Sequence, residues 1–398
     1  MTFPATRDEA LRRLKAFVPE AGHAYAAGRN IDPGPGRPTA VSRLSPYVRH
    51  RLITEEEIIA AVLAQHDARA AEKYVQEVLW RTYWKGWLET RPCVWARFCA
   101  ERDHQTQAFA GSLTLHQAQT GQTGIEGFDD WVRELVQTGY LHNHARMWFA
   151  SIWIFTLKLP WSLGADFFLR HLIDADAASN TLSWRWVAGL QTPGKTYLAS
   201  ADNIARNTHQ RFAPKGLATE AVALTELPLP GPVDLVEQRV APIAEPALLL
   251  VTSEDLHPES VFDATNPFVA AVVATDRQGL WGEAARGFIE AAAVDTITRV
   301  SAVFGCPTTL HDSLEPERLL SAARAAGVRQ ILTPYAPVGP VADALADIAS
   351  RLAVDGVTLV QVRRRWDERL WPYATKGFFP FKARAMASLA AGAAIGCP

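Results

Sequence analysis

Two acids, an amide and two indoles crowd one short stretch of this chain, HLIDADAASNTLSWRW at residues 171–186. Asp176, Asn180 and Trp184 follow one another at every fourth position, which on a helix places them on one face. An ordinary buried helix face carries aliphatic side chains. A face that combines a carboxylate, an amide and an indole therefore predicts a polar, aromatic binding partner.

Two earlier segments add further polar and aromatic groups. In RPTAVSRLSPYVRH, the hydroxyls of Ser42 and Ser45 precede an expected helix start, where they could bind phosphate or simply cap the helix. In EKYVQEVLWRTYWKGWL, Trp80 and Trp84 recur at helical spacing together with Glu77. An aromatic stripe of this kind usually belongs to a hydrophobic core.

A third segment, GYLHNHARMWFASIWIFTLKLPW, places Arg146 and Asn143 in an otherwise apolar helix. A buried guanidinium requires a carboxylate partner, and Asp174 is the natural candidate. The pair by itself would fit a structural salt bridge. Combined with the serine loop and the tryptophans, it predicts a site for a buried, charged, planar cofactor.

The elements that must position these residues change character along the chain. Residues 1–222 have helical periodicity, with a capping signal where Thr54 precedes a glutamate-rich first turn. Residues 223–246 are rich in proline and predict an extended linker. Within 247–398, β-rich runs alternate with alanine-rich helical stretches, namely ALLLVTS, FVAAVVATD, TTLHD, QILTPY and VTLVQVR. The predicted fold is multidomain α and α/β: an all-helical domain, then a parallel-sheet Rossmann-like α/β domain.

Composition excludes several classes of protein. The 398 residues are 48% hydrophobic and 21% charged with a net charge of −2, values typical of a globular protein. No apolar run approaches the roughly 18 residues that cross a membrane. The four cysteines, Cys93, Cys99, Cys306 and Cys397, lack metal-type spacing. They predict free thiols in a reducing cytoplasm and no metal site.

Four motifs in fixed order, SRLSPY, EVLWRTY, TGYLHNHARM and LIDADAASNTLSWRW, carry a family resemblance. The stretch from about Tyr25 to Pro214 resembles the FAD-binding helical domain of the photolyase/cryptochrome family. One departure is Val41, where the family's phosphate loop usually has a threonine hydroxyl. The resemblance implies FAD as cofactor.

The resemblance also implies roles around the flavin. The serine loop would wrap the phosphates, Arg146 and Asp174 would lie against the isoalloxazine, and Asn180 would face its N5. The full cofactor-binding set is Tyr25, Ser42, Leu44, Ser45, Arg81, Asn143, Arg146, Asp174, Asp176 and Asn180.

A pocket for an extruded pyrimidine dimer is implied at Glu77, Trp80, Asn143, Met147 and Trp186. The family's (6-4) repair enzymes carry histidines at the positions of Asn143 and Met147, so this chain has the cyclobutane-type pair.

A tryptophan relay that photoreduces the flavin is implied to run from Trp184 to Trp161, with Trp95 as a loosely aligned third member. Together with Glu77, Asn180 and Met147, Trp184 and Trp161 form the expected catalytic set.

The C-terminal part resembles the α/β antenna domain with which the family usually begins. LLLVTSEDLHPES is similar to its opening strand and loop, and WPYATKGFFPFKARAM to its closing motif. The resemblance therefore implies a circularly permuted order. An antenna chromophore could bind at the carboxyl ends of the strands, although no residue identifies one.

The leading hypothesis is light-driven DNA repair, in which excited reduced FAD passes an electron to a flipped-out cyclobutane pyrimidine dimer. A cryptochrome-like blue-light photoreceptor is the alternative, and a flavin-binding remnant without DNA affinity is a third. We expect a monomer whose partner is UV-damaged DNA, held by a basic rim that includes Arg49, His50 and Arg51, or Arg91 and Arg97.

Overall fold

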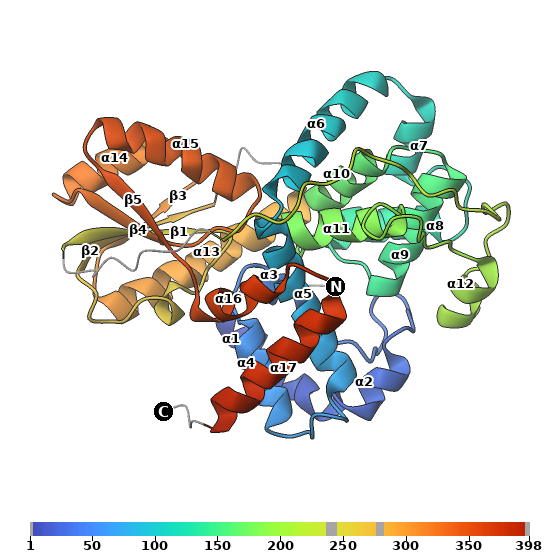
Figure 1. Cartoon of the computed structure of the whole chain (residues 1–398), viewed down its shortest axis with the longest axis horizontal. Helices are drawn as coiled ribbons and strands as arrows, with labels where there is room; N and C mark the ends of the chain where they lie inside the picture. Colours follow the sequence, from blue (N-terminus) through green and yellow to red (C-terminus); the bar gives the residue numbers. More distant parts are fainter. Residues whose placement is uncertain (1–2, 236–244, 276–281, 395–398) are drawn as a thin grey trace.

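The first part of the computed structural model, which describes residues 3–235, 245–275 and 282–394, is helical. Helices α6–α11 gather around α5 in Figure 1, and α1–α4 lie at the opposite end of α5. Together these helices form the helical lobe. Its elements are α1 (Arg7–Phe17), α2 (His23–Gly28), α3 (Ser45–Arg49), α4 (Glu55–Leu63), α5 (Glu72–Glu89), α6 (Pro92–Ala108), α7 (Leu113–Thr120), α8 (Phe128–Thr138), α9 (Asn143–Ser151), α10 (Trp161–His171), α11 (Ala177–Val187) and α12 (Ala201–Asn207).

Short polar side chains fix where the important helices start. The capping box predicted at Thr54 is present, because its hydroxyl accepts from the Glu57 amide while the Glu57 carboxylate accepts from the Thr54 amide. Asp176 caps α11 by accepting from the Ser179 amide at 2.8 Å. Asp176 is thus the last residue before the helix, and Asn180 and Trp184 lie within it.

All five β-rich runs form strands of one parallel sheet in the order β3-β2-β1-β4-β5. The prediction of a helical part followed by a parallel-sheet α/β part is confirmed. The elements of this sheet lobe are β1 (Ala247–Thr252), β2 (Phe268–Ala274), α13 (Glu283–Phe304), β3 (Thr308–His311), α14 (Pro316–Ala325), β4 (Gln330–Pro334), α15 (Pro340–Val354) and β5 (Thr358–Val362).

The sheet is covered on both faces, as parallel sheets must be. Alternate residues of β1 point to opposite sides, so Leu248 and Leu250 pack with α14 and α15. Leu249 and Val251 belong instead to the core that includes α13 and the helical lobe. In Figure 1, α14 and α15 lie above the sheet and α13 below it. One hydrophobic core therefore runs from the sheet lobe into the helical lobe.

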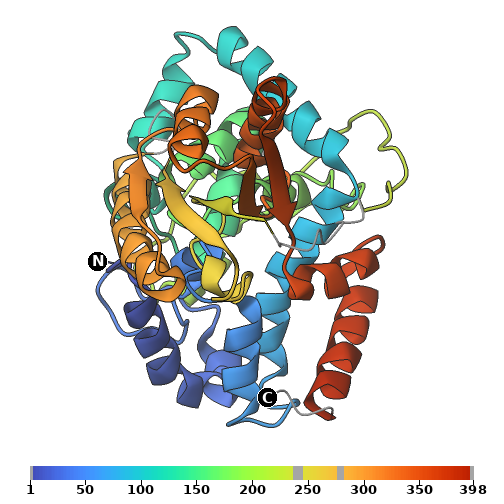
Figure 2. The same cartoon turned by 90° about the vertical axis from the view of Figure 1, so that its left-hand side faces the viewer.

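Two C-terminal helices return to the helical lobe. α16 (Arg365–Leu370) and α17 (Phe378–Ala394) follow β5, and α17 lies alongside α5 in both views of the chain (Figures 1 and 2). The hydroxyl of Tyr83 in α5 donates to the Lys376 carbonyl at 2.7 Å, just before α17 begins. Helices from early and late parts of the sequence, α5 and α17, thus pack side by side.

The proline-rich segment is only partly described, because residues 236–244 lie outside the described residues. Residues 223–235 are extended and lie against the helical lobe, where the Val233 amide donates to the Thr90 carbonyl at 2.8 Å. Arg97, expected on a DNA-binding rim, donates to the Leu227 carbonyl at 2.9 Å. Its guanidinium holds this extended segment in place.

The expectation that Arg49, His50 and Arg51 belong to a basic rim is wrong, since all three are almost fully buried. Arg49 binds both carboxylate oxygens of Glu254, at 2.8 and 2.6 Å, in the loop after β1. Two buried charges are tolerated in this way because each supplies the hydrogen bonds that the other lost with water. These residues join the two lobes and leave no free charge for phosphates.

The same junction continues through Arg51, which contacts Asp367 at 2.6 Å and Asp255 at 3.4 Å. Arg364 binds both oxygens of Asp255, at 2.6 and 2.7 Å. Arg91, the other arginine expected on the rim, stacks on Trp87 and donates to the carbonyl before Lys376. Arg51 is therefore buried at the lobe junction, and Arg91, which is half-buried, packs against Trp87.

Two simple features complete the description. Among the described residues, no helix is long and apolar enough to cross a membrane. The three cysteines in the described part of the chain, Cys93, Cys99 and Cys306, are free.

We predict that Arg49→Met lowers the free energy of unfolding by about 3–5 kcal/mol, because it leaves the buried Glu254 carboxylate without its counter-charge. Urea denaturation followed by circular dichroism measures the change. The matched control is Arg351→Met, since Arg351 makes only exposed ion pairs. The control should shift stability by less than about 0.5 kcal/mol. Equal, small losses in both variants would contradict a structural role for Arg49.

Candidate functional site

A cavity of about 680 Å³ opens between α5, α9, α10 and α11 of the helical lobe. We call it the large pocket. Its volume lies within the range that holds organic ligands. Aromatic and charged side chains line it together, which is the combination that the sequence predicted for a polar, planar ligand. The predicted site residues on its wall are Ser45, Glu77, Trp80, Arg81, Asn143, Arg146, Met147, Asp174, Asn180, Trp184 and Trp186.

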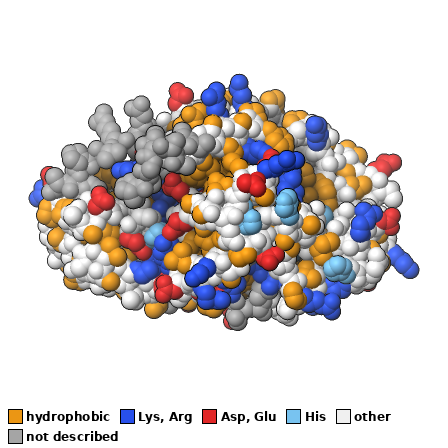
Figure 3. All heavy atoms as spheres, turned by 90° about the horizontal axis from the view of Figure 1, so that it is seen from below, with side chains coloured by type: hydrophobic (Ala, Val, Ile, Leu, Met, Phe, Trp, Pro, Cys, Tyr) orange, Lys and Arg blue, Asp and Glu red, His pale blue; other side chains and the backbone are white. Residues whose placement is uncertain are grey.

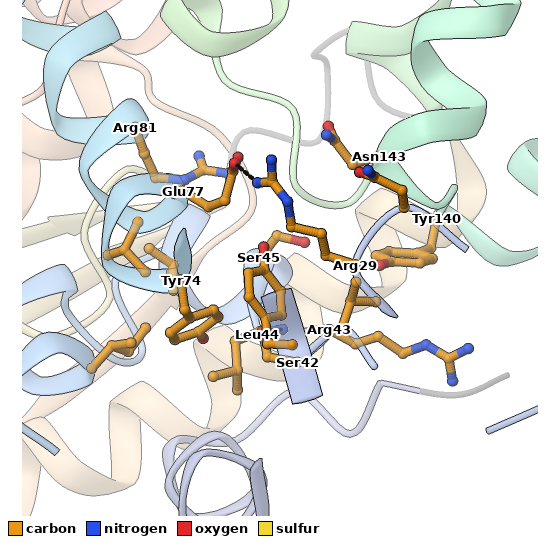
Figure 4. A pocket seen from close by; sticks show the side chains of 16 residues that line it. Arg29, Ser42, Arg43, Leu44, Ser45, Tyr74, Glu77, Arg81, Tyr140 and Asn143 are labelled. Atoms are coloured by element: carbon orange, nitrogen blue, oxygen red, sulfur yellow. Dashed lines mark hydrogen bonds and ion pairs between the residues drawn. The ribbon is translucent and has the colours of Figure 1, made fainter. Parts of the chain in front are cut away.

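A smaller cavity of about 220 Å³ adjoins it, and we call it the small pocket. Figure 4 shows Ser42, Leu44 and Ser45 on one side of the small pocket, with Glu77 and Arg81 of α5 across from them. Both linings contain the same seven residues: Arg29, Asn30, Ser45, Glu77, Arg81, Tyr140 and Asn143. The two pockets are therefore compartments of one cleft.

The walls of the small pocket agree with a site for polar groups. Tyr25 and the hydroxyls of Ser42 and Ser45 are on its wall, together with Arg43. The helix that follows, α3, has only five residues. Side-chain hydroxyls and guanidinium groups, and not a helix dipole, are therefore the donors that this compartment offers to an anion. Val41 also lines it and contributes no hydroxyl.

Arg146 and Asp174 form the ion pair that the sequence analysis anticipated. Two parallel hydrogen bonds of 2.8 Å join the guanidinium to the carboxylate. Burial alone would raise the pKa of Asp174, but the charge and hydrogen bonds of Arg146 outweigh it and keep the pKa lowered. Arg146 also donates to the Leu141 carbonyl at 2.9 Å. Both charges are thus held rigidly in the wall of the large pocket.

Asp176 pairs with Arg81 of α5. Burial opposes its ionisation, yet the positive charges of Arg81, Lys85 and Arg49 lower the pKa of Asp176 to about 2. The linings of both pockets include Arg81 and not Asp176. Asp176 therefore lies behind Arg81 and positions it, so a direct contact of Asp176 with a ligand stays a prediction.

Asn180 presents its amide from the middle of α11. Its Nδ2 donates to the carbonyl of Ala165 in α10 at 2.8 Å, which fixes the orientation of the side chain. Next to it, a Cβ on Gly164 would approach Trp184 Cη2 within 2.3 Å. Glycine at this position therefore lets the six-membered ring of the indole approach the backbone of α10 closely.

Glu77 is paired with Arg29, a residue that the sequence analysis did not single out (Figure 4). The carboxylate and the guanidinium are each about one third exposed or less, with side-chain exposures of 32% and 27%. They lie where the two pockets meet. The ion pair orients the Glu77 carboxylate toward the cleft. No sequence pattern marks Arg29 as a site residue, so its role is visible only from its position in the structure.

Two tryptophans from different helices, Trp186 and Trp80, belong to the wall of the large pocket. Trp186 of α11 is 37% exposed and stacks on Tyr197 with ring centroids 5.7 Å apart. Trp80 of α5 is half-buried and lies 5.1 Å from Trp84. Met147 lines the same space. The structure brings together all five residues of the predicted dimer pocket, Glu77, Trp80, Asn143, Met147 and Trp186.

The predicted electron relay is only partly reflected in ring contacts. Trp184 lines the large pocket, and its ring contacts among the described residues are with Phe149, Trp153 and Phe168. The Trp153 ring lies 6.2 Å from it. Trp161 contacts Phe98, at 5.7 Å.

Phe98 also contacts Trp95, at 5.3 Å, so Trp161 and Trp95 share one phenylalanine neighbour. Trp153, which sequence spacing gave no reason to select, is the indole in ring contact with Trp184. The roles of Trp161 and Trp95 as second and third donors stay predictions.

Several buried polar atoms at the pockets have no hydrogen-bond partner within the described part of the chain. They are Arg43 Nε, Ser179 Oγ and Trp184 Nε1. Arg43 lines the small pocket, and the other two residues line the large one. Buried polar groups are normally satisfied, and a site for a polar ligand explains such exceptions.

Comparison with known proteins shows what this part of the chain is similar to. Residues 74–216 match the model of the FAD binding domain of DNA photolyase. A deoxyribodipyrimidine photo-lyase of Alkalihalophilus pseudofirmus is 29% identical over 210 residues, which cover 52% of this chain and 43% of that protein. One from Thermus thermophilus is 31% identical over 218 residues, covering 52% and 48% respectively.

Among solved structures, a bacterial class III photolyase from Agrobacterium tumefaciens is similar at 24% identity and a TM-score of 0.41, covering 52% of this chain and 44% of that one. The chain spans about half the length of the curated relatives it matches.

The residues present fit FAD. The large pocket has the size and the aromatic lining that a flavin ring requires, and the small pocket adds hydroxyls and a guanidinium for phosphates. Among the described residues, Arg43 Nε has no hydrogen-bond partner and belongs to a residue of the small pocket, where the phosphates would lie. Ser179 Oγ also has none and belongs to a residue of the large pocket, where the flavin ring would lie. FAD is therefore the cofactor that this cleft accommodates.

We predict that Arg146→Met lowers the flavin content of the purified protein at least tenfold, because Asp174 would be left as a buried, unpaired charge beside the ring. Flavin absorbance per polypeptide measures this. Arg133→Met is the matched control, since Arg133 forms a half-exposed ion pair with Asp130 and should not affect flavin content. Full flavin content in Arg146→Met would remove this ion pair from the cofactor site.

We also predict that Trp184→Phe slows photoreduction of the bound flavin at least tenfold when a thiol is the final electron donor. Trp184 lines the pocket, and electron transfer decays steeply with distance. Absorbance during blue illumination follows the rate. Trp131→Phe serves as the control, because Trp131 is equally buried but packs against Trp148. A rate equal to that of the unaltered protein would exclude Trp184 as first donor.

Proposed function

We propose, from the premise that this chain belongs to the photolyase/cryptochrome family and carries its FAD-binding domain, that the protein splits cyclobutane pyrimidine dimers in DNA under light. One observation carries the proposal. A single cleft contains both the flavin-type residues Arg146, Asp174 and Asn180 and the five dimer-type residues Glu77, Trp80, Asn143, Met147 and Trp186. A protein that only stored or sensed flavin would have no need of the second set.

When bound, reduced and excited by light, FAD would supply the electron that opens the cyclobutane ring and would take that electron back once the ring has split. The chain supplies position and surroundings. Arg146 and Asp174 present a fixed pair of opposite charges, and Asn180 presents an amide whose orientation is set by the Ala165 carbonyl. Because each of these groups is already held by a partner within the protein, they need no rearrangement when the ligand arrives.

The substrate side of the cleft suits a flipped-out pair of pyrimidines. Trp80 and Trp186 offer flat apolar faces, and Met147 fits an irregular surface between them. Glu77 can accept hydrogen bonds from an imide or amino edge, and Asn143 can both donate and accept. A base that has left the duplex is recognised by this combination of stacking and edge contacts.

Arg29 gives Glu77 its direction in the proposed reaction. The guanidinium binds the carboxylate where the two pockets meet, so one face of Glu77 is held and the remainder can turn to a substrate. A fixed carboxylate loses less conformational freedom when it binds than a free one.

The chain as a whole offers little general electrostatic attraction for DNA. The net charge is −2, and Figure 3 shows lysine and arginine side chains interspersed with acids over the face in view. With Arg49 and Arg51 buried at the lobe junction, affinity must come mainly from the extruded dimer itself. Binding should therefore discriminate strongly between damaged and undamaged DNA.

The proposal further includes a monomer working in the cytoplasm. One chain brings the flavin-type and the dimer-type residues together in the cleft, which supports the proposal of a monomer. Free thiols at Cys93, Cys99 and Cys306 agree with a reducing compartment.

The test is illumination of the reduced, flavin-loaded protein with single- and double-stranded oligonucleotides that contain one thymine dimer. We expect dimer to be converted to thymines in the light and not in the dark, measured by chromatography. Flavin photoreduction without any dimer splitting would contradict repair and would favour the photoreceptor alternative.

We predict that Glu77→Gln weakens binding of dimer-containing DNA about tenfold, because a hydrogen bond to a charged group contributes about 1.5–3 kcal/mol. Fluorescence anisotropy with a labelled oligonucleotide measures affinity. Glu56→Gln is the control, because Glu56 forms an exposed ion pair with Arg369 away from the pocket. Unchanged affinity in Glu77→Gln would remove Glu77 from the substrate site.

A further inference from the structure

Behind the aromatic wall of the large pocket lies a residue from the other end of the chain. Phe378, the first residue of α17, stacks on Trp80 with ring centroids 3.6 Å apart and planes within 8°. Phe378 is only 4% exposed and is not part of the pocket lining. One face of the Trp80 indole therefore rests on Phe378, while Trp80 also borders the cavity.

Neighbouring rings confine this stack from the sides. Tyr83 meets both rings nearly edge-on, with centroids 5.5 Å from Trp80 and 5.5 Å from Phe378. Trp84 lies 5.1 Å from Trp80, and Phe381 lies 5.4 Å from Tyr83. Edge-to-face and stacked pairs of this kind add about 0.5–1.5 kcal/mol each beyond their buried area. The indole is therefore held in one orientation.

Polar contacts fix α17 itself against α5. The Tyr83 hydroxyl donates to the Lys376 carbonyl at 2.7 Å, and Arg91 donates to the Thr375 carbonyl at 2.9 Å. One helical turn further on, Lys382 pairs with Glu72 at 2.7 Å. These contacts fix the start of α17, and with it Phe378, relative to α5, and Figure 2 shows the helix α17 running beside α5.

We propose that Phe378 is a positioning residue for the substrate site, which holds the Trp80 ring as a rigid platform on which the extruded base stacks. The proposal rests on the proposed function and names a contribution of the C-terminal helix to it. An indole that is free to rotate must be ordered when a base binds, and that cost weakens binding. Stacking on Phe378 removes this cost in advance.

The chain supplies its own control, because the next residue is also a phenylalanine. Phe379 is 68% exposed and lies 5.8 Å from Phe378. It belongs to the same turn of α17 but makes no ring contact with Trp80. A comparison of substitutions at the two positions therefore separates the effect of the stack from a general effect of altering α17.

The experiment measures binding of the flavin-loaded full chain to dimer-containing and undamaged oligonucleotides, together with dimer splitting at saturating DNA. Phe378→Leu keeps an apolar side chain in the core but removes the flat ring. We expect its dissociation constant for dimer-containing DNA to rise about fivefold to tenfold. Affinity for undamaged DNA, flavin content and the splitting yield at saturation should stay unchanged. Phe379→Leu should match the unaltered protein in every respect.

Phe378→Tyr, which restores a stacking ring, should recover most of the affinity. Equal affinities in Phe378→Leu and Phe379→Leu, or a loss that extends equally to undamaged DNA, would overturn the proposal. If Phe378→Leu melts at a lower temperature, the affinity of each variant is measured at the same number of degrees below its own melting temperature. A loss of affinity in Phe378→Leu that persists under these conditions, and that Phe378→Tyr reverses, supports positioning, whereas a loss that disappears reflects stability alone and overturns the proposal. Absence of preferential dimer binding in the unaltered protein would instead refute the proposed function, and the positioning role with it.

Discussion

The hydrogen bonds of Arg49 and His50 hold the two lobes and the pocket in one arrangement. Arg49 binds Glu254 beyond β1 through two bonds and donates from Nε to the Ala175 carbonyl at 2.7 Å. His50 lies between the carbonyls of Ser253, at 2.7 Å, and Ile173, at 3.1 Å, and its neutral imidazole has one N–H to donate to one of them. The backbone of the loop 173–175 is thus fixed from behind by residues that also grip the sheet lobe.

This constraint explains how one acid can line a cleft in a protein core while a second acid lies directly behind its wall. A buried carboxylate is stable only when each of its lost water contacts is replaced. Asp174 has Arg146 and Asp176 has Arg81, and the loop that carries both acids is braced by Arg49. The positive charges keep the acids ionised, so the walls of the cleft carry fixed, opposite charges. Such a wall is suited to a planar ligand that has polar edges.

Much of the fold follows from local patterns in the sequence. The strands of 247–398 are short, β-rich and bounded by turns, and all five form. Thr54 and Asp176 mark helix starts because their side chains cap free amides. The Arg146 to Asp174 pair was also predictable, because a charge in an apolar helix needs a partner and few were available.

Contacts between distant segments could not be predicted in this way. Arg49 and Glu254 are 205 positions apart, and nothing local to RPTAVSRLSPYVRH distinguishes a buried arginine from a surface one. Likewise, the pairing of Arg29 with Glu77 and the stack of Phe378 on Trp80 depend on how helices meet. The family resemblance thus located most of the cleft, but neither it nor the local patterns identified the residues that hold the cleft from behind.

The central claim is that one cleft in the helical lobe holds FAD against the Arg146 and Asp174 pair and leaves room beside it for a dimer. A crystal structure of the flavin-loaded protein tests this most directly. The account predicts isoalloxazine density next to Asp174 and Asn180, phosphate density near Ser42 and Ser45, and open space between Trp80 and Trp186. Flavin density elsewhere, or a flavin that fills the space between those two indoles, would contradict it.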